Sequence, residues 1–168
     1  VMYVEGVETP QDYVQARKYF KLAVLQGRRD GMNNLGNLYS LGLGGEIDHK
    51  SAIALFTRAS KLGSEKASIT IANLYLDGTG FPEKSHSFAY LYFKLSINQS
   101  EGKGHAFAVD YVKKTEDDVA ARAKKDGTPK REFGETTQRL LKEITSDAWT
   151  NTFLGPSSED KQKVSDDV

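Results

Sequence analysis

Apolar residues near the N-terminus recur with the spacing of an amphipathic helix. Ala16, Tyr19, Phe20 and Ala23 stand at i, i+3, i+4 and i+7, which places them on one face of an α-helix. Gly27 follows at the point where a helix commonly ends with a residue in the left-handed conformation. The pattern therefore predicts a helix that buries this face and ends at Gly27.

A second helix is predicted directly after the first. Met32, Leu35, Gly36 and Tyr39 share one face, and Gly42 stands where that helix should end with a positive φ. A glycine inside a helix costs about 1 kcal/mol relative to alanine. We expect Gly36 to be tolerated because a small residue there allows a neighbouring helix to approach closely.

The same pattern of apolar and glycine positions returns 36 residues later, as from Ala16 to Ala52. Matching pairs at this offset include Phe20 with Phe56, Ala23 with Ala59, Gly27 with Gly63, Leu35 with Ile71, Gly36 with Ala72, Asn37 with Asn73, Tyr39 with Tyr75 and Gly42 with Gly78. A fixed period of this length is typical of helical repeat proteins, in which each unit buries its apolar face against its neighbours. We expect Tyr39 and Tyr75 to be largely buried between helices, and Gly78 to have a positive φ like Gly42.

The pattern weakens toward the C-terminus but stays helical. Ala89, Phe93 and Ser96 form a third, degenerate copy of the first helix of the repeat. Thr115 and Asp118 fit a capping box and predict that a short helix starts there. A last helix is predicted with Leu140, Leu141, Ile144 and Ala148 on one face. We interpret these two final helices as a cap on the last repeat.

The predicted organisation has six parts. They are the end of a truncated upstream repeat at 1–10, repeat 1 at 11–46, repeat 2 at 47–82, a degenerate repeat 3 at 83–114, capping helices at 115–154 and a polar, flexible tail at 155–168. The first part follows from Tyr3 and Gly6, which lie one period before Tyr39 and Gly42. A cut repeat would leave an open apolar face, for which we expect fraying or self-association.

The motif A-x-x-x-F-x-x-A-x-x-x-G followed by L-G-x-L-Y-x-x-G-x-G resembles the Sel-1-like repeat family, a relative of the tetratricopeptide repeats. The resemblance covers Ala16 to Gly80 closely and Ser85 to Lys114 loosely. It implies an all-α fold, a right-handed α-solenoid of antiparallel helix pairs, and a role in assembling protein complexes. Many bacterial members of the family act in the periplasm or at the cell surface, so the resemblance favours that location.

Composition narrows the classes of partner. Lys and Arg total 23, as do Asp and Glu, and neither half of the chain is basic enough to suggest a nucleic acid. No apolar run approaches the roughly 20 residues of a membrane span, so we expect no direct membrane insertion. The chain has no cysteine, which excludes disulfides, thiolate metal sites and a cysteine nucleophile.

Few residues suggest catalysis. His49 and His86 fall in predicted loops without a second ligand one helical turn away, so we interpret them as exposed histidines rather than zinc ligands. Asp117 and Asp118 are more simply explained as acids in a helix first turn than as a general acid and base. The glycine cluster at 42–45 follows a helix and recurs as GTG, which indicates a turn. We predict a non-enzyme with no cofactor and no metal site.

The surface predicted to hold a partner lies on the second helix of each repeat. In tetratricopeptide relatives this helix lines the concave groove, and here its face away from Leu35 and Tyr39 is polar. The predicted partner-binding residues are Asn33, Asn34, Asn37, Lys66, Asn73 and Asp77. Asparagine both donates and accepts hydrogen bonds, which suits an extended peptide backbone. The alternative is that these are ordinary solvated positions of an amphipathic helix.

Two functions of different classes fit these features. The first is a non-catalytic scaffold or adaptor that binds a protein or peptide on its concave face. The second is an inhibitor or immunity protein that blocks a cognate enzyme through a broader surface. The size of the buried interface would distinguish them, because a groove-bound segment buries less area and depends on a few anchors.

Overall fold

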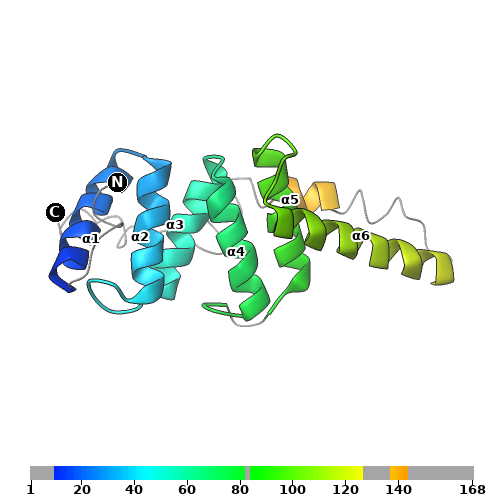
Figure 1. Cartoon of the computed structure of the whole chain (residues 1–168), viewed down its shortest axis with the longest axis horizontal. Helices are drawn as coiled ribbons and strands as arrows, with labels where there is room; N and C mark the ends of the chain where they lie inside the picture. Colours follow the sequence, from blue (N-terminus) through cyan, green and yellow to red (C-terminus); the bar gives the residue numbers. More distant parts are fainter. Residues whose placement is uncertain (1–9, 82–83, 127–136, 144–168) are drawn as a thin grey trace. The chain divides into compact units, whose positions relative to one another are not determined.

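The structure of the protein is a computed structural model that describes residues 10–81, 84–126 and 137–143. All of the regular structure in these three ranges is α-helical (Figure 1). The helices are α1 (Pro10–Leu25), α2 (Arg29–Leu41), α3 (His49–Lys61), α4 (Glu65–Asp77), α5 (His86–Gln99) and α6 (Ala106–Asp126), followed by a short helical segment at 137–143. The described residues fall into two compact units, 10–62 and 63–143.

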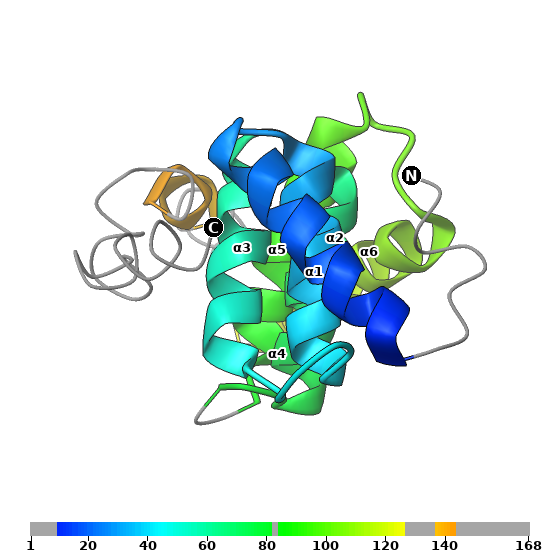
Figure 2. The ribbon, with the colours of Figure 1, turned by 90° about the vertical axis from the view of Figure 1, so that its left-hand side faces the viewer.

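The first unit is built from α1, α2 and α3. The helix α2 packs against both of the others, as Figure 2 shows from the side of α1. The apolar face predicted for the first helix of each of the first two repeats is largely buried, as shown by Ala16, Phe20, Ala52, Phe56 and Ala59. Tyr19 is 53% exposed, so its predicted place on the buried face of α1 is wrong.

Gly36 of α2 packs tightly against Phe56 of α3, as predicted for a small residue. A Cβ added to Gly36 would stand 2.7 Å from Cε1 of Phe56. Phe56 is itself 1% exposed, so its ring has no room to retreat. The cost of an internal glycine in α2 is therefore offset by the insertion of a large aromatic ring.

The helix boundaries follow from local chemistry. Gly42 has φ 67° and Gly78 has φ 77°, so the predicted left-handed ends of α2 and α4 are confirmed. At the start of α3, the Asp48 carboxylate accepts a hydrogen bond from the backbone N–H of Ser51 at 2.9 Å. Burial raises the pKa of Asp48, but the hydrogen bonds to Ser51 outweigh it, so the net pKa is lowered.

The loop after α2 is held by Arg17 of α1. Its Nε donates to the carbonyl oxygen of Leu43 at 2.6 Å, and its Nη2 donates to those of Leu38 at 3.2 Å and Glu46 at 3.0 Å. The same guanidinium stacks over the ring of Tyr39, 4.6 Å from its centroid. One side chain thus satisfies carbonyls at the end of α2 and fixes the glycine-rich turn.

The second unit contains α4, α5, α6 and the segment at 137–143. Tyr75 of α4 is 8% exposed and stacks against Phe81 at 3.8 Å, Phe88 at 5.1 Å and Tyr92 at 5.8 Å between ring centroids. Burial raises the pKa of Tyr75 to about 12. The predicted burial of Tyr75 is therefore confirmed, and aromatic stacking provides it.

The structure corrects two predictions about elements and their cores. Tyr39 is only partly buried, because the guanidinium of Arg17, rather than an aromatic cluster, covers its ring. The helix start predicted at Thr115 is wrong, since α6 continues through it and the Thr115 hydroxyl donates to the Tyr111 carbonyl at 2.8 Å. Asp117 and Asp118 consequently lie inside α6 rather than in a first turn.

The two histidines predicted to lie in loops are helical. His49 and His86 are the first residues of α3 and α5. Ile144, Ala148, the expected upstream repeat end and the expected tail lie outside the described residues, apart from Pro10 at the start of α1. The six-part organisation, the hand of the superhelix and the capping role of the last helices remain predictions.

Candidate partner-binding surface

The predicted polar surface of α2 is smaller than the sequence indicated. Asn33 is only 5% exposed, so its placement on an open face is wrong. The reason is that α2 packs against both α1 and α3, which buries a wide arc of the helix. Asn34 and Asn37, three residues apart, are partly exposed and remain available at the surface of the first unit.

The corresponding surface of α4 is open. Lys66, Asn73 and Asp77 are all exposed, and their spacing of seven and four residues places them in one stripe. The stripe lies away from Tyr75, whose ring is buried in the aromatic cluster. The structure thus brings the three predicted residues of α4 together on one helix face.

Asn37 and Asn73 occupy equivalent positions in their helices. The helices α2 and α4 are both 13 residues long, and each asparagine is the fifth residue from the C-terminal end. Neither side chain forms part of the buried core of its unit. Asn37 belongs to the first unit and Asn73 to the second, so each contributes to the surface of its own helix.

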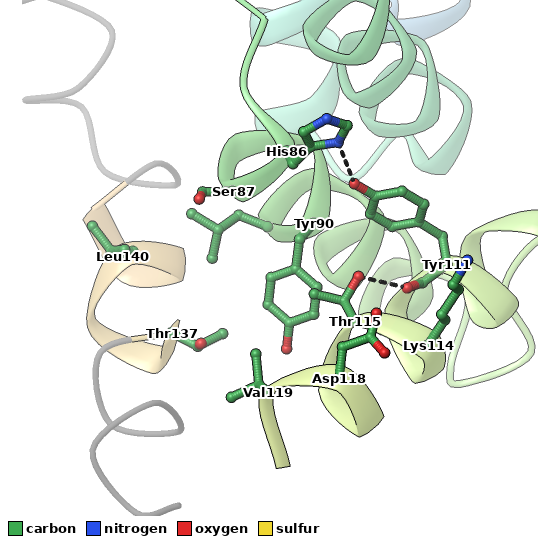
Figure 3. Close-up of a pocket in the computed structure, with 11 residues that line it drawn as sticks. His86, Ser87, Tyr90, Tyr111, Lys114, Thr115, Asp118, Val119, Thr137 and Leu140 are labelled. Carbon is green, nitrogen blue, oxygen red and sulfur yellow. Dashed lines mark hydrogen bonds between the residues drawn. The ribbon is translucent and has the colours of Figure 1, made fainter. Parts of the chain in front are cut away.

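A pocket that sequence reasoning missed lies within the second unit (Figure 3). It has a volume of about 730 Å³ between α5, α6 and the segment at 137–143. The described residues that line it are His86, Ser87, Tyr90, Leu91, Tyr111, Lys114, Thr115, Asp118, Val119, Thr137 and Leu140. Three segments far apart in the sequence form it, so no local motif could have revealed it.

Hydrogen bonds fix the walls of this pocket. The Tyr90 hydroxyl donates to Oε1 of Glu116 at 2.9 Å, and Nζ of Lys94 donates to the Tyr90 hydroxyl at 3.3 Å and to the same carboxylate oxygen. Two other lining residues are linked: Nδ1 of His86 and the Tyr111 hydroxyl share a hydrogen bond of 3.2 Å, drawn in Figure 3. These contacts hold the two tyrosine rings in place.

The charges beside the pocket stabilise each other. Burial lowers the pKa of Lys94, but its hydrogen bonds to Glu116 and Tyr90 outweigh that effect, so the net pKa is raised. Burial raises the pKa of Glu116, and the hydrogen bonds from Lys94 and Tyr90 reverse this and leave the pKa lowered. Burial, reinforced by the bond to Glu116, raises the pKa of Tyr90. The pair Lys94 and Glu116 therefore links α5 to α6 as an ion pair near neutral pH.

Two other kinds of site are absent from the described residues. No group of three or more His, Asp or Glu residues within the described ranges is placed to hold a metal ion. None of the helices in the described part of the chain combines the length and the apolar character needed to cross a membrane.

Comparison with known proteins agrees with this architecture. The family model for the Sel1 repeat matches residues 1–27, 29–64 and 71–101. Among solved structures, the crystal structure of a protective antigen of uropathogenic Escherichia coli with an SLR fold is similar, with a TM-score of 0.58 and 20% sequence identity. The similarity covers 94% of this chain but 30% of that one, and at this identity it shows the fold alone. No curated protein matches the chain.

Proposed function

This chain belongs to the Sel1 repeat family, and from that premise we propose that it is a non-catalytic scaffold that binds a protein partner. Sel1 repeats mediate interactions between proteins, and the described part of the chain has the helical-pair architecture of such repeats. Repeat arrays of this kind present side chains from successive helices to a partner.

We propose that the partner binds to the exposed polar residues of the second helix in each repeat. The observation that carries this proposal is the stripe of Lys66, Asn73 and Asp77 on α4, which is exposed and takes no part in the core. Asn34 and Asn37 add a smaller polar surface on α2. Asn33 is left out because its side chain is buried.

The chemistry of these residues supports an extended peptide as the bound segment. An asparagine amide can donate to a peptide carbonyl and accept from a peptide N–H, which provides binding without strict sequence preference. Lys66 and Asp77 lie at the two ends of the stripe on α4 and carry opposite charges. They would select acidic and basic side chains of the bound segment.

The test starts from a partner captured from the source cell and then purified. Calorimetry would compare the wild type with the double variant Asn37→Ala/Asn73→Ala. Each lost hydrogen bond should weaken binding by about 0.5–1.5 kcal/mol. Asn98→Ala is a matched control, because Asn98 is an exposed asparagine on α5, outside the proposed surface.

The result separates the two candidate functions. A weaker affinity of the double variant, with unchanged thermal unfolding and an unaffected control, supports the polar stripe as the binding site. Equal affinities would contradict it and would favour an inhibitor that covers a broad surface elsewhere on the molecule.

We also propose that the chain self-associates through α1. Val14, Leu22 and Leu25 are 41%, 42% and 56% exposed and lie within one quadrant of the helix. An apolar strip of this kind on a helix surface is suited to contact with a second copy.

A further inference from the structure

The pocket of the second unit has no role in the proposed function, and the packing of the other helices suggests what it accepts. Where one helix pair meets the next helix, an aromatic ring is inserted. Phe56 of α3 packs against Gly36 of α2. Phe88 of α5 stacks against Tyr75 of α4. In both cases the following helix supplies the ring.

The described helical segment that follows α6 supplies no such ring to the pocket. The next described helical segment after α6 is 137–143, and it contributes only Thr137 and Leu140 to the lining. Neither side chain has the volume or shape of phenylalanine. A cavity of about 730 Å³ remains, within the range of roughly 300–1,000 Å³ that binding pockets occupy.

We infer that this pocket is an anchor site for one aromatic side chain presented by a helix of a protein partner. Much of its lining is apolar: Tyr90 and Leu91 of α5 are 4% and 2% exposed. Val119 of α6 and Leu140 of segment 137–143 also line it (Figure 3). Tyr90 offers a ring for offset or edge-to-face contact with a second aromatic group. Its hydroxyl already donates to Glu116, so an entering aromatic group would leave that bond intact.

The rim adds charge complementarity for a helix. Lys114 and Asp118 are exposed, lie four residues apart on α6 and line the pocket. Residues four apart on a helix share one face about 6 Å apart along the axis. A partner helix with an acid and a base at the same spacing can pair with both, while its aromatic residue enters the pocket.

The first experiment uses two synthetic helical peptides of identical composition. Each carries one tryptophan and, on the same face, a glutamate and a lysine four residues apart, and the two charged residues are exchanged between the peptides. Calorimetry with the full chain should show a preference for one peptide, and replacing its tryptophan by alanine should weaken binding at least roughly tenfold. The variant Lys114→Asp/Asp118→Lys should reverse the preference, a result that a purely structural role of these residues would not produce.

The second experiment fills the pocket from within. Leu140→Trp places an indole in the cavity and should abolish binding of the preferred peptide. Gln138→Trp is the matched control, because Gln138 is exposed on the same segment and does not line the pocket. Circular dichroism and thermal unfolding would check both variants. If Leu140→Trp fails to fold, the charge exchange at the exposed rim still tests the inference.

Each other outcome contradicts the inference. Absence of binding by both peptides, or binding that ignores the tryptophan, would show that the pocket does not hold an aromatic anchor. N-acetyltryptophanamide binding as tightly as the preferred peptide would indicate a site for small aromatic molecules instead. The inference rests on the proposed function only in taking the ligand to be a protein. Its experiments leave α2 and α4 unchanged, so their failure is distinct from failure of the asparagine surface.

Discussion

The need for a small residue at Gly36 is explained by the side chain in van der Waals contact with it. The sequence assigns Gly36 to close helix packing, because its repeat partner Ala72 is also small. The structure adds the identity of the neighbour, Phe56. The sequence could not reveal that neighbour, since the contact depends on how α3 crosses α2.

We predict that Gly36→Ala destabilises the protein, although alanine is the better helix former. The added methyl group would meet three atoms of the Phe56 ring at 2.7, 3.0 and 3.1 Å. Overpacking typically costs about 1–3 kcal/mol, against a gain in helix propensity of about 1 kcal/mol. Denaturant unfolding should therefore show a net loss of roughly 1 kcal/mol in the free energy of unfolding.

The same change should behave differently when the ring is gone. In a Phe56→Leu background, Gly36→Ala should become neutral or stabilising, because the smaller side chain leaves room for the methyl group. A loss of equal size in both backgrounds would show that the clash with Phe56 is not the cause.

The burial of Asn33 was not predictable from helical periodicity alone. Helical periodicity assigns Asn33 to an open face, yet it is buried because α2 has neighbours on two sides. Periodicity identifies one buried face, and it underestimates burial when a helix packs against more than one partner. The exposed positions of α4 were predicted correctly from the same periodicity.

At the scale of elements, the helix boundaries of the first two repeats were largely predictable. The glycines with positive φ that end α2 and α4 agree with the prediction. Three helix starts do not: His49 and His86, predicted in loops, begin α3 and α5, and Thr115 resembles a capping residue but lies inside α6. Between Tyr111 and Asp126 no glycine or proline interrupts the chain, so helix propagation prevails and the Thr115 hydroxyl bonds back to the preceding turn.

Arg17 joins α1 to the end of α2 and to the loop that follows it. The repeat pattern did not reveal this role, because the equivalent residue in the next repeat is Ile53. We predict that Arg17→Leu lowers the free energy of unfolding by about 1–2 kcal/mol, since three carbonyls lose a charged donor that is partly exposed to solvent. Thermal unfolding would measure this loss. Arg58→Leu, at an exposed arginine of α3, should change stability far less. Equal effects of the two variants would contradict the role assigned to Arg17.

The link between α5 and α6 should depend on pH. The folded pKa of Glu116 lies below its ordinary value of 4.5, so its contribution to stability is present above that value and is lost as the pH falls through the folded pKa. The pKa of Lys94 is raised above 10.5, so its contribution is present below that value and is lost at higher pH.

We therefore predict that Glu116→Gln reduces the free energy of unfolding at pH 7 and has a much smaller effect once the pH is well below 4.5. Denaturant unfolding across this range would show the difference between wild type and variant shrinking as the pH falls. Asp117→Asn, an exposed acid on the same helix, is the control and should show no such convergence. A pH-independent difference for Glu116→Gln would mean that the carboxylate acts through packing rather than charge.

At the scale of the whole molecule, charge gives little protection against association. Lys and Arg balance Asp and Glu, so the formal net charge is zero and copies of the chain do not repel each other strongly near neutral pH. The apolar strip of α1, defined by Val14, Leu22 and Leu25, is then free to contact a second copy. Lys18 lies in the same strip, and its charge is the main local obstacle to such contact.

We predict that the chain self-associates through this strip in a manner that depends on concentration and salt. Sedimentation velocity should show the weight-average sedimentation coefficient rising with protein concentration. The rise should be steeper at high salt, which screens the repulsion between Lys18 residues of two copies. Leu22→Lys/Leu25→Lys should abolish the rise, because it places two further charges in the strip.

Leu41→Lys is the matched control: Leu41 is 65% exposed on α2, outside the strip, and its replacement should leave association unchanged. Two outcomes would contradict this prediction: a wild-type chain that stays monomeric at every concentration, or a Leu41→Lys variant that loses association as completely as the double variant. Either would show that the exposed leucines of α1 do not form a self-association surface.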